Sequence, residues 1–237
     1  MSLSISLLCL IFLTGYADPA EFFPSESRRL FHSVSHHTRA RPDSLKVVSY
    51  NIEYGEKIEQ AVAELQTDPQ LRDADILLLQ ELDPAGVMAL AEALHCNYVY
   101  YPASISPHHG RQFGNAVLTS WPIVASQLVV LPHGMLVTGH RRVASVADID
   151  LGDVVVRAVS VHTATIIMPL ERRLAQVQAV ADHLASWVGP PVIGGDFNSI
   201  TQYEVFRIRR IFRRDDCRAV RLPPGETIKG WLPKLFN

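Results

Sequence analysis

Short apolar runs recur along the chain, and each predicts a β-strand. The four most apolar runs are rich in Val, Ile and Leu and too short for an ordinary helix, so we interpret them as central, buried strands. These runs are Leu45–Tyr50, Asp75–Gln80, Val154–Val161 and Pro191–Gly195. Three further runs, which begin near Asn115, Ile123 and Val143, alternate more loosely and predict antiparallel strands with one face less buried.

Longer amphipathic stretches lie between these runs and predict helices. The three expected helices are Glu56–Leu65, Pro84–Leu94 and Pro169–Trp187. In the last of them, apolar residues three to four positions apart form one stripe, which is typical of a helix packed on a sheet. The arginine-rich stretch Phe206–Arg221 predicts a further, solvated amphipathic helix. Because strands and helices alternate along the chain, the pattern indicates the α/β class.

The composition is that of a folded and nearly neutral protein. Hydrophobic residues make up 48% of the chain and charged residues 19%, which excludes an intrinsically disordered protein. The formal net charge of -2 excludes a broadly basic surface that would coat nucleic acid. At 237 residues we expect one domain. Any anionic substrate must therefore be held by a local set of side chains.

The N-terminus resembles an export signal. Leu3–Leu13 is an unbroken apolar run, and the small residues Gly15 and Ala17 follow it as a cleavage region. We therefore expect a signal peptide over residues 1–17, a flexible segment over 18–44 and the folded domain over 45–237. The protein would then be periplasmic or secreted, whereas without a signal it would be cytoplasmic. No apolar run reaches the roughly 20 residues that span a bilayer, so we expect no transmembrane protein.

The three cysteines leave the redox state open. Cys9 would leave with the signal peptide, and Cys96 and Cys217 would remain as an even pair. An oxidising compartment allows a disulfide between them. Two free thiols that behave as small hydrophobic residues are the alternative, because no metal-ligand or redox spacing links them.

The chemistry of the chain lies at the ends of the four central strands. Asn51, Glu81 and His162 each follow such a run directly, and Asp196 and Asn198 follow the fourth. Since ligands of open α/β sheets bind at the carboxyl ends of strands, we expect these side chains to meet in one site. Carboxylate and amide oxygens are hard donors, which favours Mg2+ or Mn2+ over Zn2+. A sparse protein ligand set also indicates a substrate that carries phosphate.

Five motifs in order resemble the endonuclease/exonuclease/phosphatase superfamily, the deoxyribonuclease-I-like phosphodiesterases. They are VVSYNIEYG around Asn51, DILLLQELD around Glu81, GNAVLTSWPI from Gly114, VSVHTA around His162 and GGDFNS at Gly194–Ser199. Together they span Lys46 to Tyr203. The resemblance implies a four-layer α-β-β-α sandwich with two mixed sheets and a site for divalent-metal phosphoester hydrolysis at one end.

The resemblance also implies a role for each residue. Glu81 would be the main metal ligand, with Asn51 assisting the metal or the phosphate. Asp196 would activate the attacking water and Asn198 would position that water or the phosphate. His162 would stabilise the charge on the phosphate oxygens or protonate the leaving group. Asn115 and one of Arg141 or Arg142, of which we favour Arg142, would contact the substrate phosphate.

The sequence departs from the family pattern at its C-terminus. Nothing after Ser199 matches the Ser-Asp-His motif that supplies the family's second histidine, so the resemblance implies that the last strands of the sandwich are missing from this sequence. This leaves a truncated or non-catalytic homologue, which keeps the fold and binds phosphate or metal, as the alternative to an active hydrolase. It also predicts an unprotected sheet edge that is prone to aggregation. A calcineurin-like phosphatase is disfavoured because no D-x-H element accompanies GD-x-N.

The substrate stays open at this stage. Nucleic acid, a phospholipid head group and a small phosphodiester all suit the same core, because specificity resides in the surrounding loops. No obligate protein partner is evident.

Overall fold

Two β-sheets pack face to face in the computed structural model of the protein. The structure describes residues 24–34, 43–106, 110–135, 139–213 and 217–218. The first sheet has the order β1-β4-β5-β3-β2, with β1 (Leu30–His32), β2 (Val47–Asn51), β3 (Ile76–Leu82), β4 (Asn97–Ile105) and β5 (Gln112–Thr119). The second has the order β6-β7-β8-β9, with β6 (Ile123–Val130), β7 (Val143–Asp150), β8 (Val155–His162) and β9 (Pro191–Asp196).

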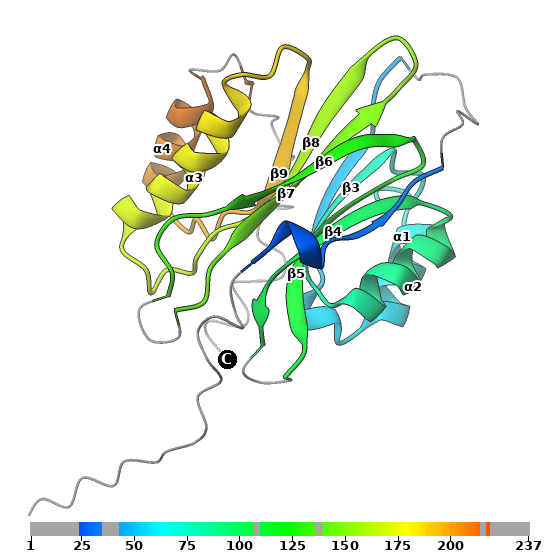
Figure 1. Ribbon diagram of the computed structural model, residues 1–237, viewed down its shortest axis with the longest axis horizontal. Coiled ribbons are helices and arrows are strands. Elements are labelled where there is room, and N and C mark those ends of the chain that lie inside the picture. Colours follow the sequence, from blue (N-terminus) through cyan, green and yellow to red (C-terminus); the bar gives the residue numbers. More distant parts are fainter. Residues whose placement is uncertain (1–23, 35–42, 107–109, 136–138, 214–216, 219–237) are drawn as a thin grey trace, which may run out of the picture.

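Helices cover the outer faces of both sheets (Figure 1). On the first sheet lie α1 (Ile58–Thr67) and α2 (Pro84–Leu94), and on the second lie α3 (Leu170–Leu184) and α4 (Gln202–Phe212). Two short 3-10 helices, η2 (Glu26–Arg28) and η3 (Glu53–Gly55), complete the described elements. The expected four-layer sandwich is thus confirmed. Within the described residues, no helix is long and apolar enough to cross a membrane.

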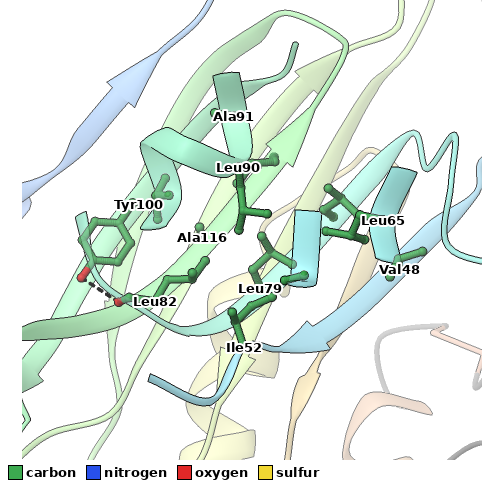
Figure 2. Packing of buried hydrophobic residues seen from close by; sticks show 13 residues of the cluster. Val48, Ile52, Leu65, Leu79, Leu82, Leu90, Ala91, Tyr100 and Ala116 are labelled. Atoms are coloured by element: carbon green, nitrogen blue, oxygen red, sulfur yellow. Dashed lines mark hydrogen bonds between the residues drawn. The ribbon is translucent and has the colours of Figure 1, made fainter. Parts of the chain in front are cut away.

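The strand pattern explains why the central runs are apolar throughout. In β3, Leu77 and Leu79 pack with the α1 and α2 side chains, whereas Ile76 and Leu78 face the second sheet. The buried apolar residues between the first sheet and helices α1 and α2 form what we call the outer cluster of that sheet, shown in Figure 2. Within it, the Tyr100 hydroxyl also donates to the Leu82 carbonyl at 3.1 Å. A strand buried on both faces gains nothing from alternation. β2 pairs with β3 and β8 pairs with β9 in parallel, while the other pairs are antiparallel, so both sheets are mixed.

The folded part begins before Leu45, which is earlier than the sequence pattern predicts. β1 pairs antiparallel with β4, with Leu30 opposite Tyr100, and Leu30 packs against the outer cluster. A strand of three residues is too short to show a period, and its Pro-, Ser-, His- and Arg-rich surroundings resemble a loop. The segment 18–44 is therefore not uniformly flexible. The expected signal peptide, together with Cys9, lies outside the described residues.

Other elements differ from expectation in smaller ways. The apolar pattern does not predict β4, because polar Asn97 begins it and Pro102 and Ser104 follow its three tyrosines, so that no regular alternation is visible. Thr201 caps α4 through a reciprocal capping box with Glu204, so this helix begins well before the arginine-rich stretch. Within the described residues, Cys96 and Cys217 form no disulfide. Cys96 packs on the outer cluster of the first sheet and Cys217 on that of the second.

The two sides of the sandwich treat their edge strands differently. At the β6 edge, a Glu26 carboxylate oxygen accepts a hydrogen bond from the Leu128 amide at 2.6 Å, and Arg29 donates to the Ser126 hydroxyl at 2.8 Å. This edge is thus covered by η2. At the other side, β2 and β9 are the outermost described strands of their sheets and lie near one another.

Candidate active site

Four of the predicted site residues come together at one end of the sandwich. The Asn51 amide donates to an Asp196 carboxylate oxygen at 3.1 Å and so links the two sheets at their β2 and β9 edges. The Nε2 atom of His162 lies 3.7 Å from a Glu81 oxygen and 3.9 Å from an Asp196 oxygen. Residues more than a hundred positions apart therefore surround one small volume.

Strand pairing brings these side chains to the same level. His162 is opposite Asp196 in the parallel β8–β9 pair, and Asn51 is opposite Gln80, the residue before Glu81. A register shift interrupts β3 between Gln80 and Leu82, and Glu81 has a left-handed backbone with φ 59°. Such a bulge re-aims a side chain at the end of a strand. The bulge leaves the Glu81 carboxylate partly open to solvent, with its side chain 14% exposed.

The turn after β9 fixes the second carboxylate. The backbone N–H of Asn198 donates to Asp196 Oδ1 at 2.8 Å, an Asx turn, while Asn51 occupies Oδ2. The Asn198 side chain is buried and donates to the Thr163 carbonyl at 3.0 Å. Asn198 thus ties the ends of β8 and β9 together. Its direct contact with water or phosphate stays a prediction.

Arg142 determines the tautomer of His162. A guanidinium nitrogen of Arg142 lies 3.2 Å from Nδ1 of the imidazole ring. Since a guanidinium can only donate, Nδ1 accepts and the proton of the neutral ring is on Nε2. Burial lowers the pKa of His162 well below its usual value, and the positive charge of Arg142 lowers it further. His162 therefore presents a neutral N–H donor toward Glu81 and Asp196.

The electrostatics of the site favour a bound cation. Burial raises the pKa of Glu81 and the negative charge of Asp196 adds to this, although a hydrogen bond from Asn51 and the charge of Arg142 oppose the shift. A cation between the two carboxylates would relieve both causes. The two crowded carboxylates are oxygen donors of the kind that Mg2+ and Mn2+ prefer. The Asn51 amide nitrogen faces Asp196, and the Asn51 Oδ1 accepts from the Glu53 backbone N–H at 3.0 Å.

The number of protein ligands also fits Mg2+. Among the residues that the structure describes, no group of three or more His, Cys, Asp or Glu side chains could hold a metal ion. Mg2+ needs only one or two carboxylates, since water and substrate oxygens fill its other positions. The Glu81 carboxylate therefore suits a cation that is held jointly with a phosphate, and the role of Asn51 as a metal ligand stays a prediction.

Asn115 does not join this cluster in the same way. Its amide nitrogen donates to the carbonyls of Val143 at 2.7 Å and Ser160 at 3.2 Å, which uses both protons. Asn115 thereby links β5 to the start of β7 and to β8 beneath the site. A phosphate contact would have to use its carbonyl oxygen or break these bonds.

Two groups at the site are missing from the sequence prediction. The rings of Tyr54 and Phe113 lie 5.7 Å apart, and the Arg142 guanidinium sits 5.4 Å over Phe113. Arg173 binds the Asn198 carbonyl at 2.8 Å and forms an ion pair with Glu204. The only sequence signals for the first group are that Tyr54 lies within the motif around Asn51 and that Phe113 directly precedes the motif from Gly114. The second had no signal, because a core helix fully accounts for the stripe around Arg173.

The comparisons identify the family. The model of the Endonuclease/Exonuclease/phosphatase family matches residues 48–236. The chain belongs to this family. Its members are phosphoester hydrolases that generally use divalent metals such as Mg2+. A search of curated proteins found no match.

Solved structures share the fold at low sequence identity. Sphingomyelinase C from Streptomyces griseocarneus has 18% identity and a TM-score of 0.58, and the match covers 72% of this chain and 70% of that one. A hairpin-deletion mutant of beta toxin from Staphylococcus aureus has 14% identity and a TM-score of 0.56, covering 72% and 73%. TDP2 from D. rerio, complexed with a single-strand DNA product, has 17% identity and a TM-score of 0.54, covering 70% and 65%.

Proposed function

We propose that this chain is a phosphodiesterase that hydrolyses its substrate with a divalent cation, Mg2+ or Mn2+. The observation that carries the proposal is the convergence of Glu81, His162 and Asp196 at the common ends of three strands, with Asn51 bridging the two sheets. Membership of a family of phosphoester hydrolases supports it.

Glu81 would hold the cation, assisted by the side-chain oxygen of Asn51, which in this structure accepts from the Glu53 backbone N–H at 3.0 Å. When bound, such a cation neutralises charge on the phosphate oxygens and orients the phosphate for attack. The raised pKa of Glu81 means that the metal-free carboxylate holds a proton more readily than usual. Cation binding and proton release at Glu81 would therefore be coupled.

Asp196 would orient and deprotonate the attacking water. Its two oxygens are already held by the Asn198 backbone N–H and the Asn51 amide, so the carboxylate has little freedom to rotate. The Asp196 side chain is 23% exposed and is therefore accessible to a water molecule. A fixed base within hydrogen-bond reach of its proton is what general-base catalysis requires.

His162 would act as a hydrogen-bond donor to a phosphate oxygen. Its neutral ring carries the proton on Nε2, which faces the space between Glu81 and Asp196. Because its pKa lies well below the usual value, the ring is poorly suited to carry a positive charge and protonate a leaving group. Of the two roles that the sequence suggests, charge stabilisation is therefore the better supported.

The proposed substrate is a phosphodiester of a nucleic acid, a phospholipid head group or a small molecule. Structures of similar fold include a protein named sphingomyelinase and a protein complexed with DNA, so the fold is compatible with both. We also propose an exported location, on the basis of the apolar run Leu3–Leu13.

The test is hydrolysis of bis(4-nitrophenyl) phosphate in Mg2+ and in excess EDTA. We expect Mg2+-dependent turnover that falls by about 10²–10⁴-fold in Asp196→Asn, because the general base is lost. Glu81→Gln should lose activity and weaken Mg2+ binding measured by calorimetry. Asp182→Asn and Glu92→Gln change exposed carboxylates on helices α3 and α2 and should leave turnover unchanged.

Two outcomes would contradict the proposal. Turnover that survives in Asp196→Asn would remove Asp196 as the base. A wild-type chain that binds Mg2+ or phosphate but never hydrolyses the ester would support the non-catalytic alternative.

A further inference from the structure

A buried ion pair connects the two segments that leave the site. Arg173, on the first turns of α3, donates to the Met168 carbonyl at 3.2 Å and to the Asn198 carbonyl at 2.8 Å. Its partner Glu204, on the first turn of α4, accepts from the Ile200 backbone N–H at 2.8 Å. The segment after His162 and the segment after Asp196 are therefore held together, although some thirty residues separate them.

Large apolar side chains on these segments face solvent. Met168 is buried, but its neighbours are exposed, and the exposed residues continue into the first turns of α4. We call this set the rim patch: Ile166, Ile167, Ile200, Tyr203 and Phe206. Ile167 is 78% exposed and Ile200 55% exposed. Single exposed apolar residues are ordinary, whereas several on tethered segments at the edge of a site indicate an interaction surface.

Positive charge continues the rim patch along α4. Arg209 and Arg210 follow Phe206 at the spacing that places them on the same helix face, and both are exposed, as is Arg213 beyond them. The exposed carboxylate of Glu171 on α3 is already bound to Arg207 through two hydrogen bonds of 3.2 and 3.1 Å. The surface is therefore apolar next to the site and basic beyond it, on the side where α3 and α4 lie together (Figure 1).

We propose that the rim patch binds the surface of a bilayer that contains anionic lipid. Isoleucine side chains would enter the acyl boundary, Tyr203 and Phe206 would lie at the head-group level, and the arginines would contact lipid phosphates. Nucleic acid fits less well, because exposed isoleucines neither stack on bases nor pair with phosphates. The proposal concerns binding alone and therefore stands apart from the proposed hydrolysis.

The experiment is vesicle co-sedimentation of the full chain in EDTA, which prevents metal-dependent hydrolysis. We expect the wild type to bind vesicles of about 3:1 phosphatidylcholine to phosphatidylserine more tightly than pure phosphatidylcholine vesicles. The double variant Ile167→Ser/Phe206→Ser should lose at least tenfold in binding. Replacing Arg209 or Arg210 by Gln should lose about fivefold each on the anionic vesicles and little on the neutral ones.

Val188 and Val124 provide matched controls. Val188 lies just past the other end of α3 and is 100% exposed, and Val124 on β6 is 57% exposed, so each is a solvent-facing apolar residue outside the rim patch. Val188→Ser and Val124→Ser should bind vesicles within about twofold of the wild type, since neither side chain would enter the acyl boundary. A second measurement uses Ile167→Trp, whose fluorescence should shift to the blue with vesicles, whereas that of Val188→Trp should not.

Three results would overturn the proposal. One is a wild-type chain that does not sediment with anionic vesicles. Another is equal loss of binding in the control variants. The third is binding of a single-stranded DNA oligonucleotide that the rim-patch variants abolish while vesicle binding is unaffected.

Discussion

The two ends of the sandwich each contain a buried arginine–carboxylate pair, but one pair joins two neighbouring strands and the other joins two loop segments. At the end opposite the site, Arg157 binds Asp148 through two hydrogen bonds of 2.7 and 2.9 Å, and its guanidinium lies 4.0 Å from the centroid of Trp187. Asp148 and Arg157 are opposite one another on neighbouring strands. At the site end, Arg173 and Glu204 instead hold irregular segments. The same chemistry thus reinforces a sheet at one end and shapes a site at the other.

Several residues at the site have a left-handed backbone. Tyr54, Glu81 and Asn198 have left-handed conformations although none is glycine, and all three lie at the site. At the opposite end, Asp73 and His95 are also left-handed, with φ of 59° and 53°, whereas the hairpin between β7 and β8 places a glycine, Gly152, at its positive φ of 100°. Since a side chain in this region costs roughly 1–2 kcal/mol, the site end stores strain that the hairpin avoids.

The largest expected effects come from breaking the two ion pairs. Arg173→Met and Arg157→Met should each lower the free energy of unfolding by about 3–5 kcal/mol, because each leaves a buried carboxylate without its partner. Only Arg173→Met should also lower kcat/KM of the folded enzyme, by about 10²-fold, since a displacement of the site by about 1 Å has that cost. Denaturant titration and assays well below the melting temperature separate the two effects.

Glu204→Gln sharpens this comparison, because the amide keeps the size of the carboxylate and some of its hydrogen bonds. It should fall between the wild type and Arg173→Met in both stability and kcat/KM. If Arg157→Met lost as much kcat/KM as Arg173→Met, the two ends would not differ in the way that we describe.

A second pair of variants tests the backbone. Gly195 has a φ of 146°, and an added Cβ would lie 1.9 Å from the Val161 carbonyl oxygen on the adjacent strand. Gly195→Ala should therefore cost about 3 kcal/mol and displace Asp196, the next residue. Gly152→Ala meets nothing within 4 Å and should cost about 1–2 kcal/mol with unchanged activity. Thermal unfolding of both proteins checks the order, and equal losses would contradict it.

The smallest expected effect is a pH dependence of stability. Burial lowers the pKa of His162 in the folded state, so below about pH 6.5 the unfolded chain binds a proton that the folded chain does not. The metal-free protein should lose stability as the pH falls through this region. The slope should shrink in His162→Gln when unfolding is followed in EDTA at several pH values.

His183 at the opposite end serves as the comparison. Burial and the charge of Arg157 lower its pKa, but Asp148 opposes the shift, so the stability change on protonation is smaller. We expect His183→Gln to change the slope less than His162→Gln. A larger change in His183→Gln would show that the site histidine does not dominate the acid sensitivity.

The sequence predicts those parts of the molecule that depend on short segments. Asn51, His162 and Asp196 each end an apolar strand, and the apolar run of each strand is visible in the sequence. Because ligands bind at the carboxyl ends of such strands, the sequence also predicts that these residues lie at one end of the molecule. The helix Pro84–Leu94 is found to the residue because Asp83 caps it and a proline begins it.

The parts that the sequence does not predict depend on contacts between distant residues. Arg173 and Glu204 are separated by 31 positions, and Arg173 lies on a helix whose stripe already has a structural explanation. Arg142 lies against Nδ1 of His162, a contact that no spacing in the sequence indicates, and its contact with phosphate stays a prediction. The apolar pattern does not predict β4, because Pro102 and Ser104 interrupt it and its first residue, Asn97, is a buried polar residue that donates to the Trp121 carbonyl at 2.6 Å.

The segment that contains η2 and β1 connects the two sheets to one another. β1 extends the first sheet through β4, while Glu26 and Arg29 attach to β6 of the second sheet. A protein shortened to the family match, which begins at residue 48, would lose both attachments. It would leave the main chains of β4 and β6 open for pairing with neighbouring molecules. A stable recombinant form should accordingly retain the sequence from Pro24 onward, even though no catalytic motif lies there.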